Sequence, residues 1–130
     1  MIVDDEPYNI LGLTIILQQS GYSNIQSIID SAHTGQQALD LVISAYKEGK
    51  QSYGLIFMDC SMPIMDGYTA ADKIRKFVKS VKLEQPMIVA LTGHTEEEYI
   101  KKAWIHQMDE VIPKPTNVQV IKEILKEIIL

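Results

Sequence analysis

Five short apolar runs alternate with five longer amphipathic segments along this chain of 130 residues. Apolar runs of this length are typical of strands buried on both faces of a parallel sheet. The runs cover residues 1–3, 25–29, 55–58, 87–91 and 111–112. Strict alternation of strand and helix predicts an α/β fold, a doubly wound five-stranded parallel sheet of (βα)5 order, with helices on both faces and right-handed crossovers.

The amphipathic segments predict five helices, each with apolar residues at helical spacing. They cover residues 7–20, 35–47, 68–81, 96–106 and 117–130. Pro7 suits the first turn of the first helix and Gly21 suits its C-terminal cap. Thr95 is the expected N-cap of the fourth helix, with Glu98 at the capping-box position. In the first helix, the inward stripe consists of Ile10, Leu13, Ile16 and Leu17.

Composition and charge narrow the classes of protein that the chain represents. Its length and its 46% apolar content predict one globular domain over residues 1–130. A net charge of −5 disfavours direct contact with nucleic acid. From the sequence we expect neither a signal peptide nor a membrane-spanning helix, because no apolar stretch is long enough and no basic segment precedes one. The single cysteine, Cys60, excludes an intrachain disulfide and fits a reducing compartment.

Chemically capable side chains stand where the predicted strands end. Asp4 and Asp5 follow the first strand, Asp59 the third, Thr92 the fourth and Lys114 the fifth. The carboxyl ends of parallel strands share one edge of the sheet, beside the topological switch point, so we expect these residues to converge. Three neighbouring carboxylates repel one another, and a hard cation such as Mg²⁺ relieves that repulsion.

A lysine and a hydroxyl beside such a site can hold an anion, for which a phosphoryl group is the natural candidate. Together with a carboxylate nucleophile and a metal, they favour phosphoryl transfer. Each residue also has a purely structural interpretation, as a helix-terminal acid, a turn residue or a solvated lysine. The coincidence of all of them with strand ends favours the functional interpretation.

Four blocks of sequence resemble the receiver domain of two-component signalling, the response-regulator domain. They are IVDDE at residues 2–6, LIFMDCSMPIMDG at 55–67, ALTG at 90–93 and KP at 114–115, in the family's order. The resemblance covers essentially the whole chain and implies a flavodoxin-like receiver fold. The sequence Met108-Asp109-Glu110 is similar to the form found in hybrid histidine kinases.

The resemblance implies a role for each residue of the acidic group. Asp59 would be the phosphoacceptor, taking a phosphoryl group from a partner phosphohistidine. Asp5, Asp59 and the backbone carbonyl of Ser61 would bind Mg²⁺, or Mn²⁺ in its place. Asp4 would act mainly through a metal-bound water.

The resemblance also assigns the groups around the phosphoryl site. Thr92 would hydrogen-bond the phosphoryl oxygens, and Lys114 would pair with the phosphoryl group and with Asp59. The Lys114–Pro115 peptide would be cis. Ser61 and His94 occupy the positions that control water near the acyl phosphate, and we expect a moderate lifetime.

As implied by the resemblance, the domain would catalyse its own phosphorylation and dephosphorylation. Its partner would be a histidine kinase or a histidine phosphotransfer domain, with no direct contact to nucleic acid or membrane. We expect a cytoplasmic location, as a module of a hybrid histidine kinase. Leu11 and Ile15 lie off the inward stripe, and they either contact that partner or pack within the domain.

Several positions depart from the family pattern. Val111 replaces the usual aromatic switch residue, which puts the usual coupling to Thr92 in doubt. Pro113 removes a backbone donor and suggests an edge strand. Gln107 stands where glycine is common, and a left-handed backbone there would cost about 1 kcal/mol. Only three residues precede Asp4, so the first strand is expected to be truncated.

Two further features leave alternatives open. Helix three is locally basic, and we interpret its cations as a solvated face; they are Lys73, Arg75, Lys76, Lys79 and Lys82. The main alternatives to a hybrid-kinase module are a standalone response regulator and a phosphate-independent pseudo-receiver. An aspartate-nucleophile phosphatase is disfavoured, because it would need a second carboxylate at the position of Ser61.

Overall fold

The computed structural model describes residues 1–21, 28–94 and 96–129. Five parallel strands form one sheet of order β2-β1-β3-β4-β5. The strands are β1 (Ile2–Val3), β2 (Ser31–Ala32), β3 (Leu55–Asp59), β4 (Met87–Thr92) and β5 (Glu110–Pro113). From β1 the chain adds β2 on one side and then β3, β4 and β5 on the other, so the strand order reverses between β1 and β3. This topology confirms the predicted doubly wound fold.

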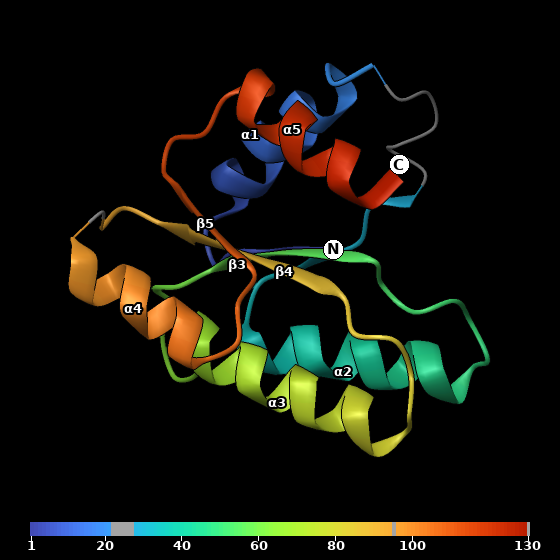
Figure 1. Ribbon diagram of the computed structural model, residues 1–130. Helices are drawn as coiled ribbons and strands as arrows, with labels where there is room; N and C mark the ends of the chain where they lie inside the picture. The colour runs from blue at the N-terminus through green and yellow to red at the C-terminus, as the bar shows by residue number, and fades with distance from the viewer. Residues whose placement is uncertain (22–27, 95, 130) are drawn as a thin grey trace.

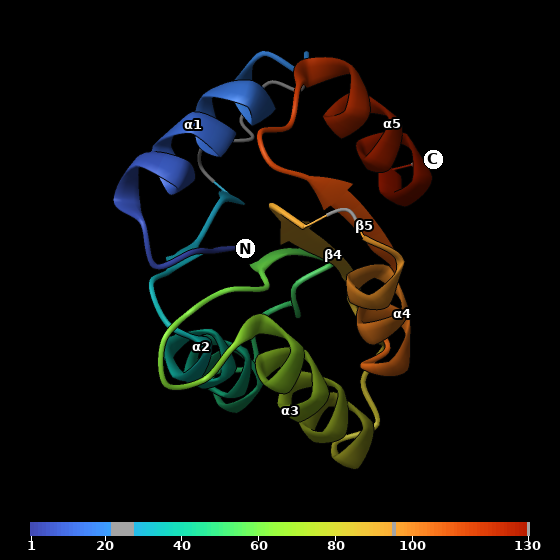
Figure 2. The same ribbon diagram turned by 90° about the vertical axis from the view of Figure 1, so that its left-hand side faces the viewer.

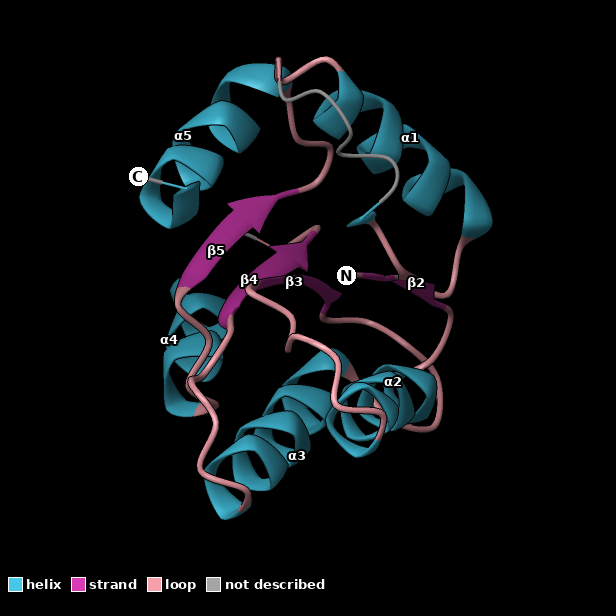
Figure 3. Cartoon of the chain, turned by 90° about the vertical axis from the view of Figure 1, so that its right-hand side faces the viewer, coloured by secondary structure: helices cyan, strands magenta, loops and turns pink. Residues whose placement is uncertain are grey.

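Helices cover both faces of the sheet (Figures 1 and 3). The helices are α1 (Pro7–Gln18), α2 (Gly35–Lys47), α3 (Gly67–Ser80), α4 (Glu97–Ile105) and α5 (Val118–Ile129). Helices α1 and α5 lie on one face, and α2, α3 and α4 lie on the other (Figure 2). None of the described helices combines the length and apolar character needed to cross a lipid bilayer.

The central strands are apolar on both faces because each face packs against a separate layer of helices. Successive residues of a strand point to opposite sides, so neighbours enter different cores. Phe57 packs with the α1–α5 side, whereas Ile56 and Met58 pack with the α2–α3 side. The predicted stripe of α1 is also confirmed, since Leu13 and Leu17 are buried against the same core as Phe57.

The second strand was predicted in the wrong place. The structure places β2 at Ser31–Ala32, and Ile28 and Ile29 of the predicted run precede it; residues 25–27 lie outside the described residues. An edge strand pairs on one side only, here with β1, and Ser31 is exposed. A short, half-exposed edge strand therefore lacks the continuous apolar signal on which the prediction relied.

Helix boundaries shift slightly from the predicted ones. Helix α1 ends at Gln18, and Gly21 has the expected positive φ of 95°. Helix α4 begins at Glu97, with Glu96 in the N-cap position and no side-chain capping bond. Thr95, the predicted cap, lies outside the described residues. These are shifts of one or two residues, which leave the packing faces unchanged.

Around the fifth strand, the structure agrees with three features that the sequence predicted. Strand β5 lies at the edge of the sheet, where Pro113 needs no outer hydrogen-bond partner. Gln107 has a φ of 62°, the left-handed conformation anticipated at that position. The Lys114–Pro115 peptide is cis.

The interpretation of the basic residues of helix α3 as a solvated face is wrong for Arg75. Its four lysines are exposed, but Arg75 is buried, with 8% of its surface accessible. Its guanidinium donates to the carbonyls of Gln107 and Pro86 and to the carboxylate of Asp109. Arg75 therefore joins α3 to the segments that precede β4 and β5.

Gly12, in the middle of α1, offers a test of helix stability. It is exposed, and an added Cβ would meet nothing within 4 Å. We expect Gly12→Ala to raise the free energy of unfolding by about 0.5–1 kcal/mol, because alanine loses less backbone entropy in a helix. Urea denaturation measures this change. Gly49→Ala is the contrasting control. Gly49 has a φ of 69°, which alanine adopts only with strain, so this variant should have a lower free energy of unfolding.

Candidate functional site

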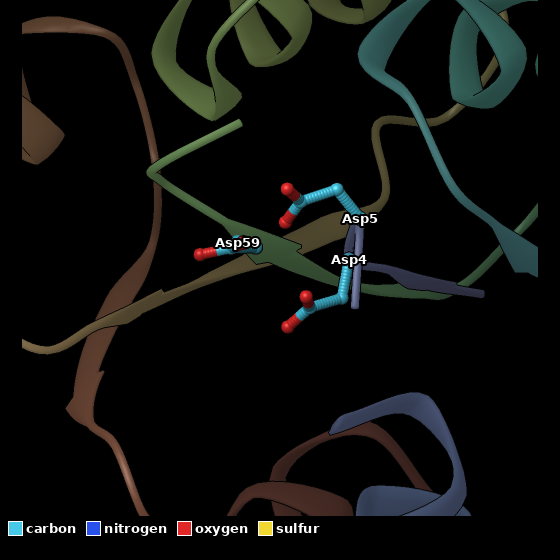
Figure 4. A group of neighbouring side chains, drawn as sticks. All are labelled: Asp4, Asp5 and Asp59. Carbon is cyan, nitrogen blue, oxygen red and sulfur yellow. The ribbon is translucent and has the colours of Figure 1, made fainter. Parts of the chain in front are cut away.

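Three carboxylates meet at the C-terminal edge of the sheet. Asp4 and Asp5 follow β1, and Asp59 is the last residue of β3, which lies beside β1 (Figure 4). One ligand oxygen from each lies within 4.8 Å of the others. Asp4 and Asp59 are 1% and 4% exposed, whereas Asp5 is open to solvent. The convergence predicted from the sequence is therefore present.

Lys114 joins the buried carboxylates to the fifth strand. Its ammonium donates to Asp4 Oδ2 at 2.9 Å and lies 3.0 Å from Asp59 Oδ1. Its backbone N–H donates to the carbonyl of Thr92, which fixes the end of β5 against β4. One cation thus bridges two acids from strands that are far apart in sequence.

Asp4 is held by donors from the start of α1 as well. Its Oδ1 accepts the backbone N–H of Glu6 at 2.9 Å and the side-chain amide of Asn9 at 3.3 Å. Together with the Lys114 bond to Oδ2, both oxygens of this buried carboxylate have partners. Asn9 was not singled out from the sequence, and its only signal there is its position in the first turn of a helix that begins beside an acidic strand end.

The electrostatics of the site are unfavourable for three bare carboxylates. Burial, and after it the negative charge of Asp4, raises the pKa of Asp59, although the hydrogen bond from Lys114 opposes this. Burial alone would lower the pKa of Lys114, but its hydrogen bonds to Asp4 and Asp59 outweigh that effect and raise it. One lysine is too little charge for three acids, so the site favours an additional cation.

The donor set of this site fits Mg²⁺. All the candidate ligands are oxygen atoms, and the three carboxylates lie close enough to share one ion. Mg²⁺ prefers oxygen ligands and few protein carboxylates. The predicted metal-binding role of the Ser61 carbonyl stays a prediction; its backbone N–H donates to Asp59 Oδ1 at 3.2 Å.

Thr92 and its neighbours border the site on the side of α4. Thr92 is 4% exposed, and its hydroxyl accepts the backbone N–H of His94 at 3.0 Å. His94 is exposed, as expected, and its ring stacks on Tyr99 with centroids 4.3 Å apart. Val111 is partly buried against the core shared by α2 and α3.

Gly67 fixes the backbone behind Asp59, a role that the sequence analysis missed. A Cβ at Gly67 would lie 2.1 Å from the backbone carbonyl oxygen of Asp59. The first residue of α3 therefore lies directly against the end of β3. The sequence signal was present in the quoted block, which ends in Asp66-Gly67, but only the structure identifies what the glycine avoids.

Replacing Gly67 by alanine should displace the end of β3. The new methyl group collides with backbone, which moves less easily than a side chain, so we expect a loss of about 1–3 kcal/mol in unfolding free energy. Urea denaturation measures the loss, and Mg²⁺ titration should show weaker binding. Unchanged stability and unchanged Mg²⁺ affinity would contradict this interpretation of the contact.

A cleft of about 380 Å³ adjoins the acidic group. It lies between α1 and the segment that follows β5, and both Asp4 and Lys114 reach its wall. Two exposed apolar residues stand on the same helix, Leu11 at 56% and Ile15 at 43% exposure. Of the two interpretations of these residues, the structure therefore favours an accessible surface over internal packing.

Comparison with known proteins identifies relatives over nearly the whole chain. Residues 1–126 match the family model described as the response regulator receiver domain. Hybrid signal transduction histidine kinase L of Dictyostelium discoideum is 35% identical over 98% of this chain. Histidine kinase CKI1 of Arabidopsis thaliana is 32% identical over 95%. The chain spans only 7% and 12% of the lengths of these two relatives.

Solved structures show the same fold. The receiver domain of CKI1 complexed with Mg²⁺ matches with a TM-score of 0.77 and 33% identity, covering 95% of this chain and 88% of that one. A receiver domain of yeast Ssk1, solved with the histidine phosphotransfer protein Ypd1, matches with a TM-score of 0.77 and 28% identity, covering 98% of this chain and 85% of that one.

Proposed function

Because the chain belongs to the response regulator receiver domain family, we propose that residues 1–130 form one receiver domain that takes a phosphoryl group from a partner phosphohistidine onto Asp59. The observation that carries the proposal is the bridge made by Lys114 between Asp4 and Asp59, beside a third carboxylate, at the edge of the sheet. This arrangement supports the proposal, because phosphoryl transfer to a carboxylate needs a nucleophile, a cation and metal ligands close to one another.

The transfer is a displacement at phosphorus. A carboxylate oxygen of Asp59 attacks the phosphorus atom, the bond between phosphorus and the imidazole nitrogen breaks, and the imidazole keeps the electron pair. Bonds from Lys114 and the Ser61 N–H hold Asp59 Oδ1 and orient the carboxylate. The Lys114 ammonium and the Thr92 hydroxyl are then placed to stabilise the phosphoryl oxygens.

Asp5, Asp59 and the Ser61 carbonyl would hold Mg²⁺, with Asp4 acting mainly through water. The ion would supply positive charge that offsets the carboxylates and the transferred group. The burial of Asp4 and Asp59 strengthens these interactions, because less water screens them. Mn²⁺, another divalent ion suited to oxygen ligands, would serve at the same site.

The partner would be a histidine kinase or a histidine phosphotransfer domain. The exposed Leu11 and Ile15 on α1, together with the cleft that Asp4 and Lys114 line, would offer the partner a docking surface. We propose that this domain is one module of a hybrid histidine kinase and acts in the cytoplasm. The similarity to hybrid kinases over most of the chain supports this context.

Phosphorylation would change the segment after β4. Movement of the Thr92 hydroxyl toward the phosphoryl group would break the hydrogen bond that it accepts from the backbone N–H of His94. His94 lies between β4 and α4 in the chain. Val111 has no ring to follow that movement, so the change would spread through the segment that precedes α4. A two-state shift of this kind needs only a difference in contacts between the two states.

Intact mass measurement after incubation with acetyl phosphate tests the proposed function. With Mg²⁺ present we expect one phosphoryl adduct, and none when the metal is chelated with EDTA. A Mg²⁺ titration of the same protein completes the experiment. Absence of both the adduct and Mg²⁺ binding would favour a phosphate-independent pseudo-receiver instead.

A further inference from the structure

Asn9 reaches the buried carboxylate of Asp4 from the first turn of α1. Its side-chain amide donates to Asp4 Oδ1 at 3.3 Å, although Asn9 itself lies at the surface. Side chains on a helix tilt toward its N-terminus, so a residue in this turn leans back over the preceding segment. Because α1 begins right after the acidic strand end, that tilt aims the amide at the site.

The amide completes the set of donors around Asp4. Lys114 occupies Oδ2, and the backbone N–H of Glu6 shares Oδ1 with Asn9. Without Asn9, Oδ1 keeps a single donor from a residue only two positions away. The carboxylate would then rotate more freely about its last torsion, which is broad for aspartate.

We propose that Asn9 is a positioning residue for the Mg²⁺ site, holding the carboxylate of Asp4 in the orientation in which it faces the metal. The inference rests on the Mg²⁺ site of the proposed function. Residues that orient metal-binding carboxylates through hydrogen bonds affect metal affinity strongly, although they do not touch the metal themselves. Asn9 therefore sets the affinity of the site from the face that a partner protein would approach.

Calorimetric titration of the metal-free domain with Mg²⁺ tests this role. We expect Asn9→Ala to raise the Mg²⁺ dissociation constant about tenfold. Gln18→Ala is the matched control, because it removes an exposed amide side chain from the far end of the same helix. It should leave the constant unchanged.

An Asn9→Asp variant distinguishes contact with the site from a general effect on α1. The added carboxylate stands near Asp4 and attracts the ion, so Asn9→Asp should bind Mg²⁺ about threefold more tightly than Asn9→Ala. Without metal, the same charge repels Asp4, and the thermal midpoint should fall below that of Asn9→Ala. A residue that only covers the surface would produce neither difference.

The outcomes separate this inference from the proposed function. Equal Mg²⁺ affinity in the native protein and Asn9→Ala overturns the role of Asn9, and so does an equal loss in Gln18→Ala. Equal affinity in Asn9→Asp and Asn9→Ala overturns it as well. If the native domain binds no Mg²⁺ at all, the proposed metal site itself fails.

Discussion

An Asp59→Asn variant is expected to show no phosphoryl adduct by intact mass after incubation with Mg²⁺ and acetyl phosphate. The amide is a far weaker nucleophile than the carboxylate, so the transfer step is lost completely. The side chain keeps its size, and the buried site loses one of its mutually repelling charges. We therefore expect the variant to remain folded, with a thermal midpoint no lower than that of the native protein.

Asp66→Asn is the matched control for this experiment. Asp66 lies in the loop that follows Asp59, and its side chain caps α3 by accepting the N–H of Thr69 at 2.8 Å. Asparagine caps helices about as well as aspartate, so this variant should keep both its fold and its adduct. An adduct that persists in Asp59→Asn would show that another carboxylate, with Asp5 the nearest exposed one, accepts the phosphoryl group.

Arg75→Met is expected to cause the largest loss of stability, about 3–4 kcal/mol. Methionine fills much of the same space but leaves the carbonyls of Gln107 and Pro86 and the carboxylate of Asp109 without their charged donor. Asp109 keeps one bond, from the backbone N–H of Ile88. In a domain of 130 residues, such a loss lowers the thermal midpoint by about 11–15 °C.

Lys76→Met provides the comparison for Arg75. The two residues are adjacent on α3, but Lys76 is exposed, so its replacement should change the unfolding free energy by no more than about 0.5 kcal/mol. Urea denaturation of both variants separates a buried network from a general effect of charge. If Arg75→Met loses no more than Lys76→Met, the network of Arg75 contributes nothing to stability.

Local sequence patterns alone determined most of the secondary structure, the order of the elements and the edge of the sheet at which the site residues meet. Apolar runs such as 55–58 are long enough to mark a strand buried on both faces, and helical periodicity marked the inward residues of α1. Parallel strands must end on one edge, so Asp4, Asp59 and Lys114 could be placed together without any structure. The prediction failed at β2, because an edge strand of two residues carries too little apolar signal to be located.

Tertiary structure alone decided how individual side chains are used. In the sequence, Arg75 is one of five cations on helix three, but the fold buries it against two segments that come later in the chain. Gly67 and Asn9 acquire their roles from close approaches to Asp59 and Asp4. Pattern and periodicity report which face of an element is buried, because that depends on spacing along the chain. The partner of a side chain depends on packing between distant segments, which the sequence pattern does not contain.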